Sequence, residues 1–109
     1  MVMMNDTNGS PAGLFASSTQ GGFGLQVVGK AGFSTVGSGT LRARSDAATI
    51  ANPAVTATSH ISVTLTVDPG DAATIQWVER QPNVGFTVHL TRRARVDVPF
   101  TYFVVEPSA

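Results

Sequence analysis

The alternation of apolar and polar residues between positions 59 and 67 constrains the fold of this chain more than any other feature. Isoleucine, valine and leucine residues at 61, 63, 65 and 67 alternate with histidine, serine and threonine residues at 60, 62, 64 and 66. A period of two puts the two sets on opposite faces of a β-strand. The segment is therefore predicted to be a strand with one buried face and one wet face.

Further strands are predicted at 75–80, 85–91 and 98–105, after turns at 68–71, 81–83 and 92–95 that contain Pro, Gly, Asn or Arg. Shorter candidates lie at 25–28, 40–44 and 48–50, whereas Gly37 to Gly39 is interpreted as a loop. Strands separated by such turns predict an all-β fold, an antiparallel β-sandwich or a jelly-roll-like barrel. No helical periodicity of useful length competes with this interpretation.

The N-terminal residues 1–24 differ in composition from the rest of the chain. They are rich in Gly and Ser and carry two isolated aromatic residues, Phe15 and Phe23. Such a segment cannot bury enough apolar surface to fold alone. We therefore expect a flexible N-terminal arm at 1–24 and a single β-sandwich domain at 25–109.

Charge and composition exclude several classes of partner. Seven basic residues balance seven acidic ones, so no long-range field attracts nucleic acid or an anionic membrane. No segment approaches the ~20 apolar residues of a membrane helix, and the N-terminus lacks the features of a secretory signal. The chain is therefore expected to stay in the cytoplasm, or in an assembly built there, with neither nucleic acid nor membrane as a partner.

Metal, cofactor and catalytic sites are not expected. The chain has no cysteine, and its two histidines, His60 and His89, could supply at most half of a zinc site. No Asp or Glu lies nearby in matching phase, so both are interpreted as surface or interface histidines. Asp68 and Asp71 flank a Pro-Gly pair, which favours a β-turn over a calcium loop. No serine lies in a Gly-x-Ser-x-Gly elbow, and an enzyme is not expected.

Two further groups leave alternatives open. Arg92, Arg93 and Arg95 form the only basic cluster, which we interpret as a solvated loop or as an interface with acidic residues of a neighbour, rather than as a nucleic-acid site. Trp77 and Tyr102 lie within predicted strands. If buried they pack in the core, and if exposed they are interface anchors or a platform for a sugar.

Three phrases of the chain carry a resemblance to a known group of proteins. Residues 55–59, 85–88 and 103–107 read Val-Thr-Ala-Thr-Ser, Gly-Phe-Thr-Val and Phe-Val-Val-Glu-Pro. Their order resembles the small β domain of tailed-bacteriophage virion proteins, and the match covers roughly residues 37–107. The resemblance is to domains at the ends of tail fibres and in small head-decoration proteins, which are commonly trimeric.

This resemblance implies a virion structural protein. The arm, in place of the long shaft of a fibre, favours a trimeric capsid decoration (cement) protein that binds the major capsid protein at capsomer junctions. On this hypothesis Phe15, Phe23 and Leu25 anchor the arm, and Arg92, Arg93 and Arg95 lie at a subunit contact. The alternative is a fibre or spike tip that binds a receptor or glycan on the host surface.

Overall fold

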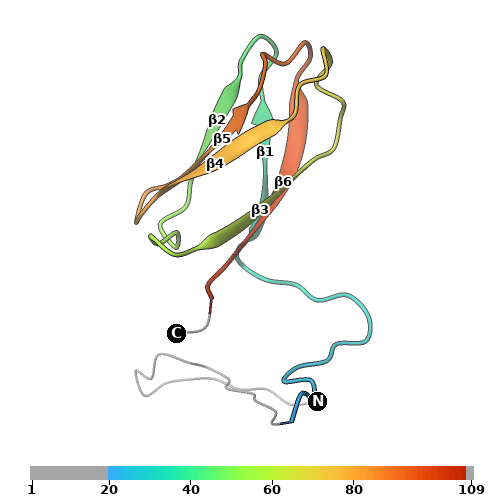
Figure 1. Cartoon of the computed structure of the whole chain (residues 1–109), viewed down its shortest axis with the longest axis vertical. Helices are drawn as coiled ribbons and strands as arrows, with labels where there is room; N and C mark the ends of the chain where they lie inside the picture. Colours follow the sequence, from blue (N-terminus) through green and yellow to red (C-terminus); the bar gives the residue numbers. More distant parts are fainter. Residues whose placement is uncertain (1–19, 108–109) are drawn as a thin grey trace. The chain divides into compact units, whose positions relative to one another are not determined.

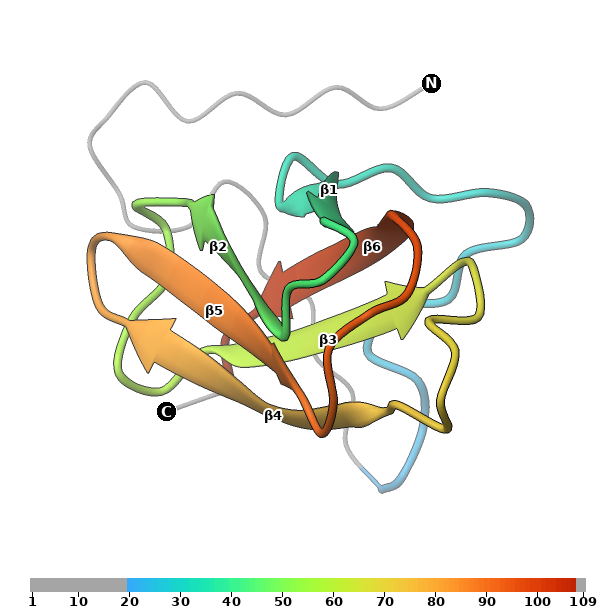
Figure 2. The same cartoon turned by 90° about the horizontal axis from the view of Figure 1, so that it is seen from above.

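The computed structural model describes residues 20–107, and within them the regular structure is entirely β. The strands form two antiparallel sheets, with strand orders β1-β6-β3 and β2-β5-β4 (Figures 1 and 2). Their bounds are β1 Val36–Leu41, β2 Ala47–Ala51, β3 His60–Leu65, β4 Ile75–Gln81, β5 Gly85–Leu90 and β6 Val98–Val105. All of them lie in the second of two compact units, Gly32–Ala109, the first being Met1–Ala31. The predicted all-β, antiparallel fold is confirmed.

One of the weaker strand predictions and one loop prediction are wrong. Residues 25–28 form no strand, and the first strand, β1, includes Gly37 to Gly39, which the sequence had suggested to be a loop. The four strands from β3 onward closely match the predicted segments. The later strands could be predicted because they contain large apolar residues in a regular pattern. Strand β1 has no such pattern, so it was missed.

The hydrophobic core draws residues from both sheets. Phe86 and Val88 of β5 and Phe100 and Val98 of β6 are fully buried in one cluster. The ring of Phe86 meets the ring of Tyr102 edge to face, with centroids 5.0 Å apart. Such a pair adds about 0.5–1.5 kcal/mol to what area burial alone contributes. The inner faces of the two sheets therefore cover the same core.

The glycines of β1 make room for the aromatic rings of β6. Gly39 pairs with Phe100, and a Cβ added at Gly39 would lie 2.6 Å from Cζ of Phe100 and 2.5 Å from Cδ1 of Ile50. A Cβ at Gly37 would clash with the ring and hydroxyl of Tyr102. Glycine in a strand costs conformational entropy, but here it allows close approach of bulky neighbours.

A tight turn joins β4 to β5. The amide of Val84 donates to the carbonyl of Gln81 at 2.9 Å, with Pro82 and Asn83 between them. Proline presets the second turn position, and Asn83 has φ 64°, a conformation that asparagine tolerates. The turn also docks on the segment before β3, because the amide of Asn83 donates to the carbonyl of Val55 at 2.8 Å.

Candidate functional site

An irregularity in β4 brings Trp77 to the surface. Ile75 pairs with Leu90 and Trp77 pairs with His89, so Gln76 is an extra residue between the two pairs. Without this bulge Ile75 and Trp77 would share one face of the sheet. With the bulge, Ile75 packs against the core and Trp77 lies on the outer face, where 51% of it is exposed.

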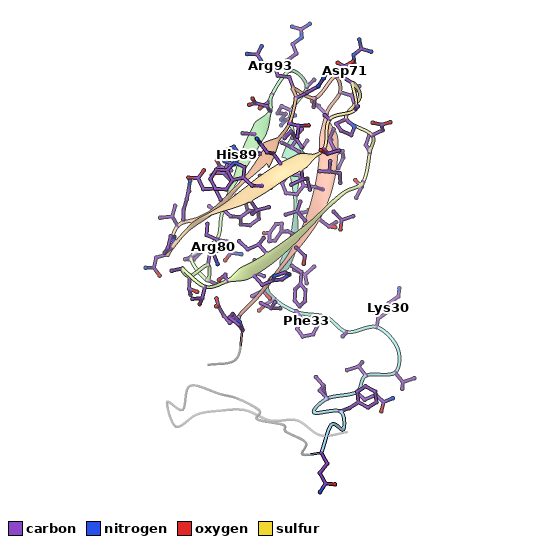
Figure 3. The ribbon with its side chains drawn as sticks, in the orientation of Figure 1. Lys30, Phe33, Asp71, Arg80, His89 and Arg93 are labelled. Atoms are coloured by element: carbon purple, nitrogen blue, oxygen red, sulfur yellow. The ribbon has the colours of Figure 1, made fainter. Side chains whose placement is uncertain are left out.

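His89 stacks on the indole of Trp77. The two rings are nearly parallel, at 8°, with centroids 4.7 Å apart. Nε2 of His89 lies 2.9 Å from Oε1 of Glu79, on the neighbouring strand. This contact holds the imidazole in place beside the indole, and Figure 3 shows His89 on the outer side of the sheet.

Polar side chains continue the same face of the sheet away from Trp77. Oγ1 of Thr49 and Oγ1 of Thr87 lie 2.9 Å apart, across β2 and β5. Nε2 of Gln81 donates to Oγ1 of Thr87 at 3.3 Å. We define the Trp77 face as the outer surface of the β2-β5-β4 sheet made by Thr49, Trp77, Glu79, Gln81 and His89, with the buried Thr87 between them.

The exposure of Trp77 decides between the two interpretations that the sequence left open. Tyr102 follows the first, since its ring packs against the core. Trp77 meets the condition of the second, because 51% of it is exposed. One sequence signal could have predicted the outward position of Trp77. Trp77 and Val78 are adjacent apolar residues, which breaks the period of two and indicates that they lie on opposite faces of the strand.

One sequence argument about the histidines was wrong. Glu79 does lie in phase with His89, because it occupies the same outer face two pairs further along β4 than Trp77, the partner of His89. His60 lies in the other sheet, with Nε2 3.0 Å from Oγ of Ser62, so the two histidines do not meet. Within residues 20–107, no group of three or more His, Asp or Glu is placed to hold a metal ion.

A second polar cluster surrounds Glu106 at the end of β6. Its carboxylate accepts hydrogen bonds from the hydroxyls of Thr56 (3.0 Å), Thr58 (3.3 Å) and Ser59. The hydroxyl of Ser59, then those of Thr56 and Thr58, and the charge of Arg80 hold the pKa of Glu106 below its ordinary value of 4.5. Residues 55–59 and 103–107, two of the three segments on which the resemblance rests, thus meet in one hydrogen-bonded cluster.

The Glu106 cluster predicts a pH dependence of stability. Because the folded pKa is lowered, the contribution of ionised Glu106 is present above the unfolded-state pKa and is lost as the pH falls through the folded value. Glu106→Gln should lower the melting temperature at neutral pH, and the gap to wild type should close in acid. Melting curves from pH 7 to about pH 2 test this. Parallel curves for the two proteins would contradict it.

A small pocket of ≈ 170 Å³ opens between the edges of β3 and β4. Ser59, His60, Ile61, Val78 and Arg80 line it, and Nη1 of Arg80 donates to the carbonyl of Ser59 at 3.2 Å. Figure 3 shows Arg80 at this edge. Pockets for small molecules typically measure about 300–1,000 Å³. This one is too small for such a ligand, and its one guanidinium already has a partner.

The predicted arm anchors fall into two groups. Phe15 lies outside the described residues, whereas Phe23 and Leu25 are 79% and 67% exposed. The sequence reasoning missed that Val27 and Val28 are also exposed, at 51% and 94%. Their signal was available, because Leu25, Val27 and Val28 are three large apolar residues within four positions, but they had been assigned to a strand that the structure does not contain.

Within the second unit, the chain before β1 also carries exposed apolar side chains. The ring of Phe33 packs against Phe103 of β6 with centroids 5.2 Å apart, and Phe33 still remains 52% exposed. Val36, which pairs with Phe103, is 50% exposed. Figure 3 shows Phe33 near the entry of the chain into β1.

The three arginines of the basic cluster have different surroundings. Nε of Arg95 lies 3.0 Å from Oδ2 of Asp71 in an exposed ion pair, which contributes little to stability. Arg92 and Arg93 are exposed, and within the described part of the chain no salt bridge involves them. Two of the three guanidinium groups are therefore open to a partner.

The chain turns near residues 68–71, but the backbone hydrogen bond of the turn lies two residues later than predicted, from the amide of Ala73 to the carbonyl of Gly70 at 3.0 Å. The amide of Gly70 donates to Oδ1 of Asp68 at 2.9 Å, and Gly70 has φ 84°. Asp71 is engaged with Arg95 instead of lying beside Asp68 as a second ligand. The aspartates thus shape the turn and attach it to the loop before β6.

Comparisons with protein-family models, with curated proteins and with solved structures found no match for this chain. Among the described residues, no helix has the length and apolar character needed to span a membrane. The function is therefore argued from the surfaces described above, together with the sequence resemblance.

Proposed function

We propose that this chain is a structural protein of a tailed-bacteriophage virion, a capsid decoration protein that assembles in the host cytoplasm. In this role it forms a homotrimer, binds the major capsid protein at capsomer junctions and acts by binding alone, without catalysis. The observation that carries the proposal is the run of exposed apolar side chains before the first strand. Phe23, Leu25, Val27 and Val28 leave half or more of their surface in water.

Burial of these side chains supplies the binding energy in this proposal. Removing apolar surface from water contributes about 25 cal/mol per Å², or about 1.5–3 kcal/mol for a fully buried Leu, Val or Phe. In this proposal the segment, which has no regular structure of its own, buries them against a partner. The shell surface at a capsomer junction is the partner that the resemblance favours.

Symmetry multiplies the effect of each docked segment. In a closed trimer three copies of the arm bind at once, so that the second and third bind intramolecularly. Arg92 and Arg93 are exposed and offer cations to acidic residues of a neighbouring subunit. Figure 3 shows Arg93 at the opposite end of the strands from Phe33.

The finer fold that we propose is a β-sandwich. One core shared by two sheets of three strands supports it. A jelly roll would have eight strands in two sheets, whereas the described residues form six.

Substitution of the arm side chains tests the docking. Phe23→Ser with Leu25→Ser should weaken capsid binding more than about a hundredfold, because each lost anchor removes about 1.5–3 kcal/mol. The melting temperature should not change, since both side chains are exposed. Cosedimentation with purified capsids measures the binding, and Val84→Ser, at a 60% exposed apolar residue of the β4–β5 turn, is the matched control. Undiminished binding of the double variant would rule out the arm as the anchor.

A fibre or spike tip is the second candidate, and the exposed Trp77 favours it. Electron cryomicroscopy of the intact particle separates the two roles. Trimers distributed over the icosahedral shell support decoration, whereas density restricted to the tail supports the tip. Copy number in purified particles gives the same distinction, since a shell protein is far more abundant than a tail appendage.

A further inference from the structure

We propose that the Trp77 face binds a neutral saccharide, with one sugar ring packed on the indole and its neighbours hydrogen-bonded along β4. The inference rests on the side chains of this face and does not depend on arm docking. It also gives the fibre-tip alternative a ligand of stated chemistry.

The open side of the Trp77 ring is the first element of the site. His89, on β5, stacks against one side of the indole. β4 is an edge strand of its sheet, so no further strand covers the opposite side, and 51% of Trp77 is exposed. The face of a pyranose ring presents weakly polarised C–H groups, which pack favourably on the electron-rich face of an aromatic ring.

The indole is held in position before any ligand binds. The carboxylate of Glu79 contacts Nε2 of His89 at 2.9 Å, and the imidazole lies parallel to the indole at 8°. This series of contacts restricts the rotamer of Trp77. A platform fixed in advance loses less conformational entropy on binding than a freely rotating side chain does.

The polar side chains of the face suit the hydroxyls of a sugar. Trp77, Glu79 and Gln81 occupy alternate positions of β4 and span about 13 Å, at ~3.3 Å per residue. The carboxylate of Glu79 is an acceptor, and Gln81 offers both an amide N–H and a carbonyl. The hydroxyl of Thr49 is exposed beside them and lies 2.9 Å from the hydroxyl of Thr87, which is buried. This order of groups matches a short chain of sugars lying along the strand.

The charge of the face favours a neutral ligand. Glu79 is its only acidic group and its side chain is 40% exposed, while His89 is the only residue that can become cationic. A uronic or sialic acid would place a second carboxylate near Glu79. Like charges at such a distance repel, so acidic sugars should bind more weakly.

A protein partner fits this face less well. The fully buried centre of a protein interface is depleted in charged residues and surrounds its aromatic anchors with near-neutral contacts that exclude water. Here an imidazole and a carboxylate lie beside the indole, and the amide of Gln81 and the hydroxyl of Thr49 lie further along the face. A ligand that carries many hydroxyls would satisfy these groups.

Tryptophan fluorescence tests the proposal directly, because Trp77 is the only tryptophan of the chain. The full-length protein is titrated with β-1,4-glucose and β-1,4-N-acetylglucosamine hexasaccharides up to about 10 mM, which covers millimolar dissociation constants. A saturable change in intensity or emission maximum is expected with at least one of them. An oligogalacturonate of the same length should give a markedly weaker response.

Variants then assign the binding to this face. In calorimetric titrations Trp77→Ala should weaken binding about tenfold or more, and Glu79→Gln should also weaken it. His60→Ala, on the outer face of the other sheet, is the matched control and should bind as wild type does. Circular dichroism confirms that each variant is folded.

Any of four results would overturn the saccharide site. These are no saturable response to either neutral probe, equal binding of the acidic oligomer, undiminished binding by the Trp77→Ala variant, or Trp77-dependent capture of purified virion protein with no sugar response. Loss of sugar binding together with normal capsid binding would leave the decoration proposal intact. The two proposals can therefore fail separately.

Discussion

Replacing Phe100 by alanine is expected to lower the free energy of unfolding by about 3–5 kcal/mol. Phe100 is fully buried on the central strand of the β1-β6-β3 sheet and belongs to the core that both sheets share. Its removal loses the transfer free energy of the ring and leaves a cavity that the strands on either side cannot easily close. For a domain of this size such a loss is a large part of the total stability.

Denaturant unfolding followed by circular dichroism measures this change. Thr101→Ala is the matched control, because Thr101 is the next residue of β6 and lies on the exposed outer face. Its effect should stay within about 0.5 kcal/mol. If the alanine variant does not fold at all, Phe100→Leu provides a milder measurement of the same site. A Phe100→Leu protein as stable as wild type would contradict the assignment of Phe100 to a tightly packed core.

Gly39→Val is expected to destabilise the protein by about 3 kcal/mol, at the upper end of what overpacking usually costs. Local propensity alone predicts the opposite, because valine favours strands and glycine weakens them by up to about 1 kcal/mol. The added Cβ would lie 2.6 Å from Cζ of Phe100, which belongs to a rigid ring and cannot move aside. The sign of the measured change therefore separates the two arguments.

The control for this variant lies one residue earlier on the same strand. Ser38 is exposed on the outer face, so Ser38→Val should be neutral or slightly stabilising. A second test combines Gly39→Ala with Phe100→Leu, since leucine lacks the Cζ atom that the new Cβ would meet. The destabilisation of the double variant should be smaller than the sum of the two single changes. Strict additivity would show that the contact between residues 39 and 100 is not the cause.

The two proposed binding surfaces, the apolar segment before β1 and the Trp77 face, suit different kinds of contact. The exposed apolar residues that precede β1 suit a permanent contact within the particle, because their burial needs no specific polar geometry. The Trp77 face suits a reversible contact with a soluble or surface-bound saccharide, because Trp77 and Thr49 are exposed and Glu79 is partly exposed. A decoration protein that also binds sugar would attach particles to a glycan-coated surface, and the variants above test each contact separately.

The prediction of the fold was most successful where the chemistry is local. Strands β3, β5 and β6 follow segments in which apolar residues alternate with polar ones or form a continuous run. The turn at Asp68 to Asp71 follows from the preferences of Asp, Pro and Gly. These features depend on residues that are neighbours in the sequence, so they could be recognised without knowing the sheet order.

Strand β1 could not be recognised in this way. Gly37 and Gly39 are strand residues only because Tyr102 and Phe100, more than sixty positions later, fill the space above them. The Glu106 cluster is similar, since Thr56 and Glu106 meet only when β6 pairs with β3. Contacts across such sequence separations depend on the pairing of whole strands.

The sequence by itself determined an antiparallel β protein without cysteine chemistry. Only the tertiary structure decided which face of β4 carries Trp77. A single extra residue, Gln76, shifts the register between Ile75 and Trp77, and the period of two then turns the indole outward, beside His89 and Glu79. A bulge is a property of two paired strands, so neither strand's sequence specifies it alone.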